Sequence, residues 1–308
     1  MTRSDAIHAA SAAPIGVFDS GIGGLSVLRA LRAELPQESF VYLADTGFAP
    51  YGERGDAFVR ARTEAITAWL KAEHHIKALV VACNTATAAA IHDLRERYPG
   101  FPIIGVEPAL KPAVAATRTG RIGVLATRGT VASAKFARLL ANLQAQAEFI
   151  VQPCAGLARA IEHSVEPGVP GTQSRAEVEA LCARYLDAMR PFGTQPGAVD
   201  TLVLGCTHYV FAEAVLRQLA GPAVRLIETG MPVARHTRRL LAQADALAAH
   251  APADVYLLTT GHPQWLQAAA TRWLKAGAPR SATRVHIPNP TQAAAPHLAA
   301  SALLHGST

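Results

Sequence analysis

The sequence predicts an α/β protein made of two similar parallel-sheet domains that face each other across a cleft. Short segments rich in Val, Ile and Leu alternate with longer segments of helical periodicity. This alternation is typical of βα units whose parallel sheet is buried on both faces. Two short motifs also occur twice in the chain, and both copies of one motif contain a cysteine. The repetition indicates that the two domains share a topology.

The apolar segments define the expected strands. They are 15–19, 40–44, 78–82, 102–106, 121–126, 148–152, 201–205, 224–227 and 254–259. After the first strand, leucines at helical spacing from Leu25 to Leu35 predict an amphipathic helix that stops at Pro36. We expect this leucine face to pack on the sheet.

The length of 308 residues allows two modest cores or one large core. Past Lys275 the chain is rich in Ala, Pro, Ser and Thr, which prevents a long helix and predicts a peripheral tail. The start of the chain lacks the compact apolar run of a signal peptide and is expected to fray. The expected parts are a first domain at 1–108 with 230–275 (1–14 frayed), a second domain at 109–229, and a tail at 276–308.

Composition excludes several classes of protein. The net charge of +6 comes from dispersed arginines without a polybasic block, so nucleic acid is not the expected partner. The apolar stretches are far shorter than the roughly 18 residues of a membrane span, so no membrane association is expected. The four cysteines form no C-x-x-C pair, which favours reduced thiols and a cytoplasmic protein.

The internal repeat aligns two cysteines. The paired segments are 15–21 with 122–129, and 79–85 with 202–208. Chance similarity between short apolar strands is the competing explanation, and the shared cysteine favours a true repeat. We therefore expect Cys83 and Cys206 to end equivalent strands of the two domains.

Both of these cysteines lie where ligands bind in open parallel sheets, outside the carboxyl end of a strand. Each is expected to precede a helix, whose dipole and free amides stabilise a thiolate, so we expect a lowered pKa for both thiols. A buried cysteine is more often a small apolar side chain, and we assign that role to Cys154 and Cys182. The repeated context favours catalysis for Cys83 and Cys206.

Polar residues at other strand ends extend the candidate site. Asp19 precedes the glycine-rich turn 21–24, whose amides suit an anionic group such as a carboxylate, although a capping role explains Asp19 equally well. The turn is no dinucleotide fingerprint, because Ser26 stands where a third glycine is needed. His208 follows Cys206 by two residues and is a candidate proton partner or a helix cap. Zinc is not expected, since the spacing of these residues matches no zinc module.

Taken in order, the motifs resemble those of glutamate racemase. The segments that carry the resemblance are 15–25, 50–52, 80–86, 127–130 and 202–209. The similarity extends from about residue 15 to residue 274. The family implies an isomerase without cofactor that interconverts L-glutamate and D-glutamate. It also implies a cytoplasmic homodimer that supplies D-glutamate for peptidoglycan precursors, and hence for cell-wall biogenesis and cell shape.

The resemblance also implies residue roles. Cys83 would remove the α-proton of D-glutamate and Cys206 that of L-glutamate, each returning a proton to the opposite face. Asp19 would assist Cys83, while His208 and Glu162 would assist Cys206, with Glu162 located by spacing alone. The substrate contacts carried over are Asp19, Ser20, Tyr51, Gly52, Asn84, Thr85, Thr207 and His208.

Three segments depart from the family pattern, at 47–49, 210–211 and 227–230, and none includes a thiol. They leave racemisation of aspartate or of a hydantoin as an alternative activity. From a different class, a non-catalytic two-domain protein that binds a small acid would tolerate replacement of either cysteine. A pyridoxal phosphate enzyme is disfavoured, because Lys77 and Lys111 lie at no strand end suited to a Schiff base.

Overall fold

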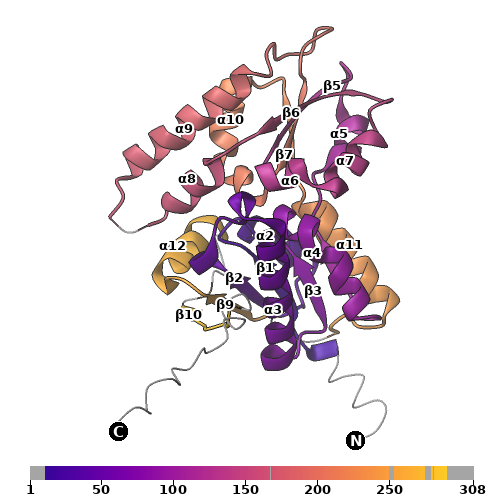
Figure 1. Cartoon of the computed structure of the whole chain (residues 1–308), viewed down its shortest axis with the longest axis vertical. Coiled ribbons are helices and arrows are strands. Elements are labelled where there is room, and N and C mark those ends of the chain that lie inside the picture. Colours follow the sequence, from indigo (N-terminus) through magenta and orange to yellow (C-terminus); the bar gives the residue numbers. More distant parts are fainter. Residues whose placement is uncertain (1–10, 167, 250–252, 275–278, 280, 290–308) are drawn as a thin grey trace, which may run out of the picture.

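The computed structural model describes residues 11–166, 168–249, 253–274, 279 and 281–289, which form two parallel sheets (Figure 1). The first sheet has the order β10 (Ala282–Arg284), β9 (Val255–Thr259), β2 (Phe40–Ala44), β1 (Ile15–Asp19), β3 (Ala78–Val81) and β4 (Ile103–Gly105). The second has the order β6 (Glu148–Pro153), β5 (Arg121–Ala126), β7 (Thr201–Gly205) and β8 (Arg225–Ile227). The predicted two-domain α/β fold is confirmed.

Helices cover both faces of each sheet. Around the first sheet lie α2 (Leu25–Glu34), α3 (Asp56–His74), α4 (Asn84–Arg97), α11 (Gly230–Gln243) and α12 (Pro263–Leu274). Around the second lie α5 (Leu110–Ala116), α6 (Arg128–Ala132), α7 (Ala134–Ala141), α8 (Leu157–His163), α9 (Gly171–Asp187) and α10 (Glu213–Ala220). Three short 3₁₀ helices, η1 (Thr46–Phe48), η2 (Tyr51–Glu53) and η3 (Thr207–Ala212), follow strand ends.

The strand order confirms the internal repeat. In the first sheet β1 pairs with β2 and β3, and β4 extends the β3 side. In the second sheet β5 pairs with β6 and β7, and β8 extends the β7 side. The residue that follows β3 by two positions, Cys83, is therefore equivalent to Cys206, which directly follows β7. The domain boundaries near residues 108 and 230 stay predictions.

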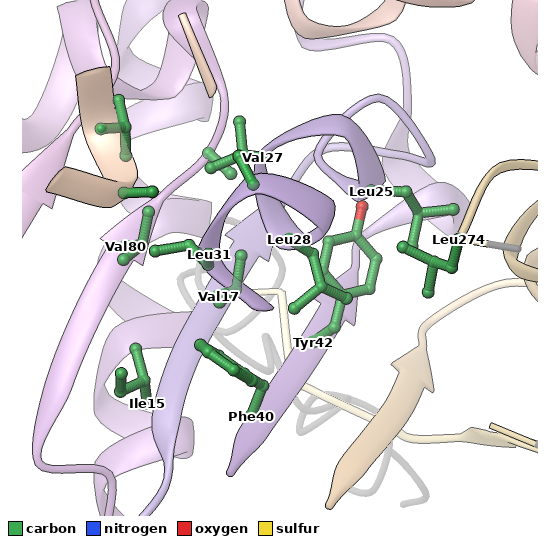
Figure 2. Close-up of a cluster of buried hydrophobic side chains, with 14 of the residues drawn as sticks. Ile15, Val17, Leu25, Val27, Leu28, Leu31, Phe40, Tyr42, Val80 and Leu274 are labelled. Carbon is green, nitrogen blue, oxygen red and sulfur yellow. The ribbon is translucent and has the colours of Figure 1, made fainter. Parts of the chain in front are cut away.

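The predicted leucine face of α2 lies in the core of the first domain (Figure 2). Leu25, Leu28 and Leu31 are completely buried, and they pack beside Val17 and Tyr42 of the sheet. Each leucine contributes about 1.5–3 kcal/mol through burial. The helix ends at Glu34, just before Pro36, so the predicted stop is confirmed within two residues.

Part of the expected tail belongs to the first domain, which corrects the prediction that 276–308 is peripheral. β10 pairs in parallel with β9 and becomes the edge strand of the sheet. Ile287, beyond it, is buried with only 3% of its surface exposed. The strand is three residues long and its residues do not alternate between apolar and polar. It forms by pairing with β9, and the sequence therefore contains no pattern that predicts it. The rest of the tail, and residues 1–10, lie outside the described residues.

Among the described residues, no helix combines the length and the apolar character that crossing a bilayer would require.

Candidate active site

The strand-end loops of the two domains contact each other, and the candidate residues lie in this contact. The amide of Ile22, after β1, donates to Glu162 Oε1 of α8 at 2.7 Å. The hydroxyls of Thr85 in α4 and Thr127 after β5 are 3.0 Å apart. The carboxyl ends of both sheets therefore meet between the domains, where the sequence predicted a cleft.

Cys83 is the N-cap residue of α4 and is only 6% exposed. Its Sγ accepts a hydrogen bond from the amide of Ala86 at 3.4 Å, and its thiol donates to Ser20 Oγ at 3.6 Å. The pKa of Cys83 is raised to about 12, chiefly by burial and next by the charge of Asp19, against the smaller effects of the Ala86 amide and Ser20. The expected lowering of this pKa is wrong, because desolvation of the thiolate outweighs the helix amides.

Cys206 has a proton partner of a different kind. Its Sγ lies 3.6 Å from His208 Nδ1, and His208 Nε2 lies 2.6 Å from Glu162 Oε1. Burial alone lowers the pKa of His208, but hydrogen bonds to Cys206 and Glu162 and the charges of both raise it well above its usual value. These contacts favour the protonated, imidazolium form of His208. A 3₁₀ turn, η3, begins after Cys206, and α10 starts only at Glu213, which corrects the expected α-helix from Thr207.

The glycine-rich turn after β1 holds carboxylates of the protein itself. Asp19 Oδ2 accepts hydrogen bonds from the amides of Gly24 at 2.7 Å and Gly21 at 3.3 Å, and Glu162 takes the amide of Ile22. The sequence predicted either an anionic group on these amides or a capping role for Asp19, and the structure shows the capping role. The carboxylates come from the chain, so these three amides are occupied.

The same turn explains why glycine is needed between the domains. A Cβ atom at Gly21 would overlap Glu162 Oε1, and one at Gly23 would overlap His208 Nδ1. Both glycines therefore let groups of the second domain approach the backbone of the first. This contact, rather than a special backbone angle, requires glycine at these two positions.

Asp19 is completely buried beside this turn. Burial raises its pKa to about 6, and this is only partly opposed by the charge of His208 and the amide of Gly24. Its Oδ1 has no hydrogen-bond partner among the described residues. Its charge acts on the pKa of Cys83, and so does the charge of Cys206. Asp19 and both thiols therefore lie within electrostatic reach of one another.

The expected substrate contacts differ in what they offer. Asn84 is buried, and neither its Oδ1 nor its Nδ2 has a partner among the described residues. The Tyr51 hydroxyl donates to Asp45 Oδ2 at 2.5 Å, so it is already engaged. Gly52 lies against Thr127, since a Cβ at Gly52 would come within 2.8 Å of Thr127 Cβ. Ser20, Thr85 and Thr207 are also buried.

Two residues of the motif at 127–130 also belong to the site, although the sequence alone assigned them no role. Thr127 caps α6, and its Oγ1 lies 3.0 Å from the hydroxyls of both Thr85 and Thr130. Both are buried, and together they connect the helix that follows Cys83 with the second domain. Thr127 directly follows β5 as Ser20 directly follows β1, and this repeated position is the signal that could have identified it.

Cys154, Cys182 and residues of two segments that depart from the family pattern, 210–211 and 227–230, make structural contacts. Cys154 donates to the carbonyl of Gln152 at 3.3 Å, and Cys182 is buried in the core of the second domain. Glu228 accepts from the amide of Gly230 at 2.7 Å at the start of α11. Phe211 stacks on Trp273 with ring centroids 3.9 Å apart.

Among the described residues, no group of three or more His, Cys, Asp or Glu side chains is arranged to hold a metal ion. A cavity of about 480 Å³ reaches the Glu162 side of the site. Its walls include Arg54 of the first domain and Arg159 of α8. The same walls carry Glu53, Glu162 and Glu166, so groups of both charges line this cavity.

Two buried thiols thus lie at equivalent strand ends where the domains meet, one near the Asp19 carboxyl group and one beside His208. The sequence profile of the Asp/Glu/Hydantoin racemase family matches residues 22–237, and the chain belongs to that family. Its relatives there are glutamate racemases, which confirms the resemblance. That of Stutzerimonas stutzeri strain A1501 is 49% identical over 253 residues, which cover 82% of this chain and 90% of the relative.

Solved structures of glutamate racemases are also similar to this chain. A glutamate racemase isoform from Bacillus anthracis has a TM-score of 0.76 and 30% identity, and the match covers 90% of this chain and 98% of that one. The Escherichia coli glutamate racemase, solved with L-glutamate and the activator UDP-MurNAc-Ala, has a TM-score of 0.74 and 29% identity over 90% of this chain and 99% of that one.

Proposed function

We propose that the protein interconverts L-glutamate and D-glutamate with Cys83 and Cys206 as the two proton-transfer groups. The observation that carries the proposal is the equivalence of the two thiols, each at a strand end with its own proton partner. Inverting a carbon centre through deprotonation needs a base on one face and an acid on the other, and the roles exchange in the reverse direction. The L-glutamate bound in the Escherichia coli relative supports the choice of substrate.

In the L-to-D direction, the thiolate of Cys206 takes the α-proton and becomes a thiol. The electron pair of the broken C–H bond delocalises into the α-carboxylate. The thiol of Cys83 then gives its proton to the opposite face, so that a new C–H bond forms and Cys83 is left as a thiolate. One proton enters and one leaves, so no oxidant or reductant is needed.

Before substrate is converted, the charges around the two thiols favour the protonation states that the L-to-D direction needs. Cys83, with its raised pKa, is a thiol and therefore a proton donor at neutral pH. The His208 imidazolium lies 3.6 Å from Cys206 Sγ, where a positive charge stabilises a thiolate. Asp19, with a pKa of about 6, can accept or return a proton near neutrality on the Cys83 side.

The proposed substrate contacts are the carried-over residues together with Thr127. Asn84 is the strongest of them, because its amide is buried without a described partner, and a buried amide group is costly unless it gains a hydrogen bond. Gly52 would contribute backbone, since the Tyr51 hydroxyl is engaged elsewhere. Ser20, Thr85, Thr207 and His208 would supply hydrogen bonds around the α-carbon.

We further propose the setting that the glutamate racemases imply, which is a cytoplasmic homodimer supplying D-glutamate for peptidoglycan precursors. All four cysteines are free thiols, as expected in a reducing compartment.

The test is purified protein with L-glutamate in D₂O and no added pyridoxal phosphate. We expect the circular-dichroism signal of the substrate to decay while deuterium enters at the α-carbon. Loss of the circular-dichroism decay in Cys83→Ala and in Cys206→Ala, but not in the matched Cys182→Ala variant, would separate catalysis from simple binding. A wild-type protein that binds L-glutamate without either effect would refute the proposal, and parallel runs with aspartate and a hydantoin decide the substrate.

A further inference from the structure

A buried ionic cluster outside the thiol site contacts the Tyr51–Gly52 turn. Its centre is Asp45, which directly follows β2 and is completely buried. Arg62 of α3 donates to both carboxylate oxygens, from Nη2 to Oδ1 at 2.7 Å and from Nε to Oδ2 at 3.1 Å. Arg62 is also completely buried. The pair is therefore a two-point ion pair in the interior of the first domain.

The remaining acceptor positions of Asp45 hold two other elements. Its Oδ2 accepts the Tyr51 hydroxyl at 2.5 Å, and its Oδ1 accepts Thr260 Oγ1 at 2.8 Å. One carboxylate thus joins η2, α3 and the loop after β9. Because the whole carboxylate is engaged, it has no free oxygen for a substrate or a solvent proton.

The chain beyond β10 completes the cluster. Arg62 Nη1 donates to the carbonyl oxygens of Ile287 at 2.9 Å and Pro288 at 3.1 Å, and the guanidinium stacks over Phe48 at 4.0 Å. These contacts use backbone carbonyls, so they depend on where the segment lies rather than on its side chains. The segment expected to be peripheral therefore helps to fix Arg62.

The turn held by Asp45 reaches the thiol site through the second domain. Gly52 lies against Thr127, and Thr127 Oγ1 lies 3.0 Å from Thr85 Oγ1, two residues after Cys83. A buried ion pair contributes little net stability compared with apolar packing, but it fixes geometry strongly because breaking it leaves a charge uncompensated.

We propose that Asp45 is a positioning residue for the racemisation site, which holds the Tyr51–Gly52 turn against Thr127, and that Arg62 and the backbone of residues 287–288 hold Asp45. The assay of this role rests on the proposed glutamate activity. The alternative is a purely structural cluster, which would affect stability and leave substrate binding unchanged.

Tyr51→Phe is the most direct test, because it removes one hydroxyl and keeps the ring. A hydrogen bond to a charged group is lost, and we expect KM for L-glutamate to rise about tenfold with kcat changed less than about twofold. Tyr256→Phe is the matched control, since Tyr256 is 53% exposed on β9. Its kinetics should equal those of the unchanged protein.

Arg62→Lys is the second test, since lysine keeps the charge but cannot bind both carboxylate oxygens in the same plane. It should raise KM in the same direction as Tyr51→Phe. If Arg62→Lys does not fold, as judged by far-ultraviolet circular dichroism, Tyr51→Phe decides alone. A folded Tyr51→Phe variant with lowered melting temperature and unchanged KM would overturn the positioning role.

Calorimetric titration with L-glutamate separates this inference from the proposed function. If the unchanged protein binds glutamate without racemising it, the proposed function fails, and Tyr51→Phe should still weaken binding relative to Tyr256→Phe. If the protein racemises glutamate, and Tyr51→Phe binds and racemises it as well as Tyr256→Phe does, only the positioning role fails.

Discussion

Glu162 Oε1 lies 2.6 Å from His208 Nε2 and also accepts the amide hydrogen of Ile22 at 2.7 Å. One carboxylate oxygen thus joins the proton partner of Cys206 to the glycine-rich turn of the other domain. The interaction couples the charge state of His208 to the contact between the domains. Glu162 is only partly buried while His208 is almost fully buried, and Glu162 lines a cavity at the surface, so solvent can reach this pair from the Glu162 side.

Replacing Glu162 with Gln should slow removal of the proton by Cys206. The amide keeps a hydrogen-bond acceptor but loses the charge that helps to raise the pKa of His208, so the imidazolium is less populated. We expect kcat from L-glutamate to fall about 10- to 100-fold, within the usual range for a proton-transfer group. Glu166→Gln is the matched control, since Glu166 pairs with His163 at 3.6 Å. Equal rates for both variants would contradict the role of Glu162.

The two thiols should act on opposite faces of the substrate. In D₂O, Cys83→Ala should exchange the α-proton of L-glutamate without inverting it, because Cys206 can still remove and return a proton on its own face. The same variant should leave D-glutamate unlabelled, and Cys206→Ala should show the reverse pattern. Mass spectrometry after enantiomer separation measures both outcomes, and labelling of both enantiomers by one variant would contradict the facial assignment.

A methyl group at Gly21 should disrupt the site through Glu162. The added Cβ would overlap Glu162 Oε1, so the carboxylate must move away from Ile22 and His208. We expect Gly21→Ala to lower kcat, and to lower stability by about 1 kcal/mol because the flexible end of Glu162 can move aside at the cost of its hydrogen bonds. Gly55→Ala is the control because its Cβ would meet no atom within 4 Å. Chemical denaturation and turnover measure the two effects, and Gly21→Ala with unchanged turnover would argue against this contact.

Asp19 should make stability depend on pH in a defined direction. Its folded pKa of about 6 lies above the ordinary value of 3.8, so the folded state binds the proton more tightly. Protonated Asp19 therefore adds about 3 kcal/mol to the free energy of unfolding. This contribution is complete below pH 3.8 and is lost as the pH rises through about 6. Asp19→Asn should therefore gain stability relative to the unchanged protein between pH 4 and pH 7. Urea denaturation at several pH values measures the difference, and a constant difference would refute the raised pKa.

The sequence by itself determined the strands and the positions of both thiols. Apolar alternation and local helix signals depend on residues that are close in the chain, so β1, β2, β5 and β7 were predicted with the bounds that the structure has. The repeated motif placed Cys83 and Cys206 at equivalent strand ends for the same reason. Spacing within a familiar family pattern located Glu162, although nothing local to it shows which group it contacts.

Only the tertiary structure decided the electrostatics of the site and the supports behind it. The pKa of Cys83 rises because atoms from distant segments exclude water from the thiol, and the local helix start alone predicts the opposite direction. The ion pair of Asp45 with Arg62 and the pairing of β10 are likewise contacts between segments far apart in the chain. Desolvation and long-range pairing depend on which surfaces the fold brings together, and no short stretch of sequence contains that information.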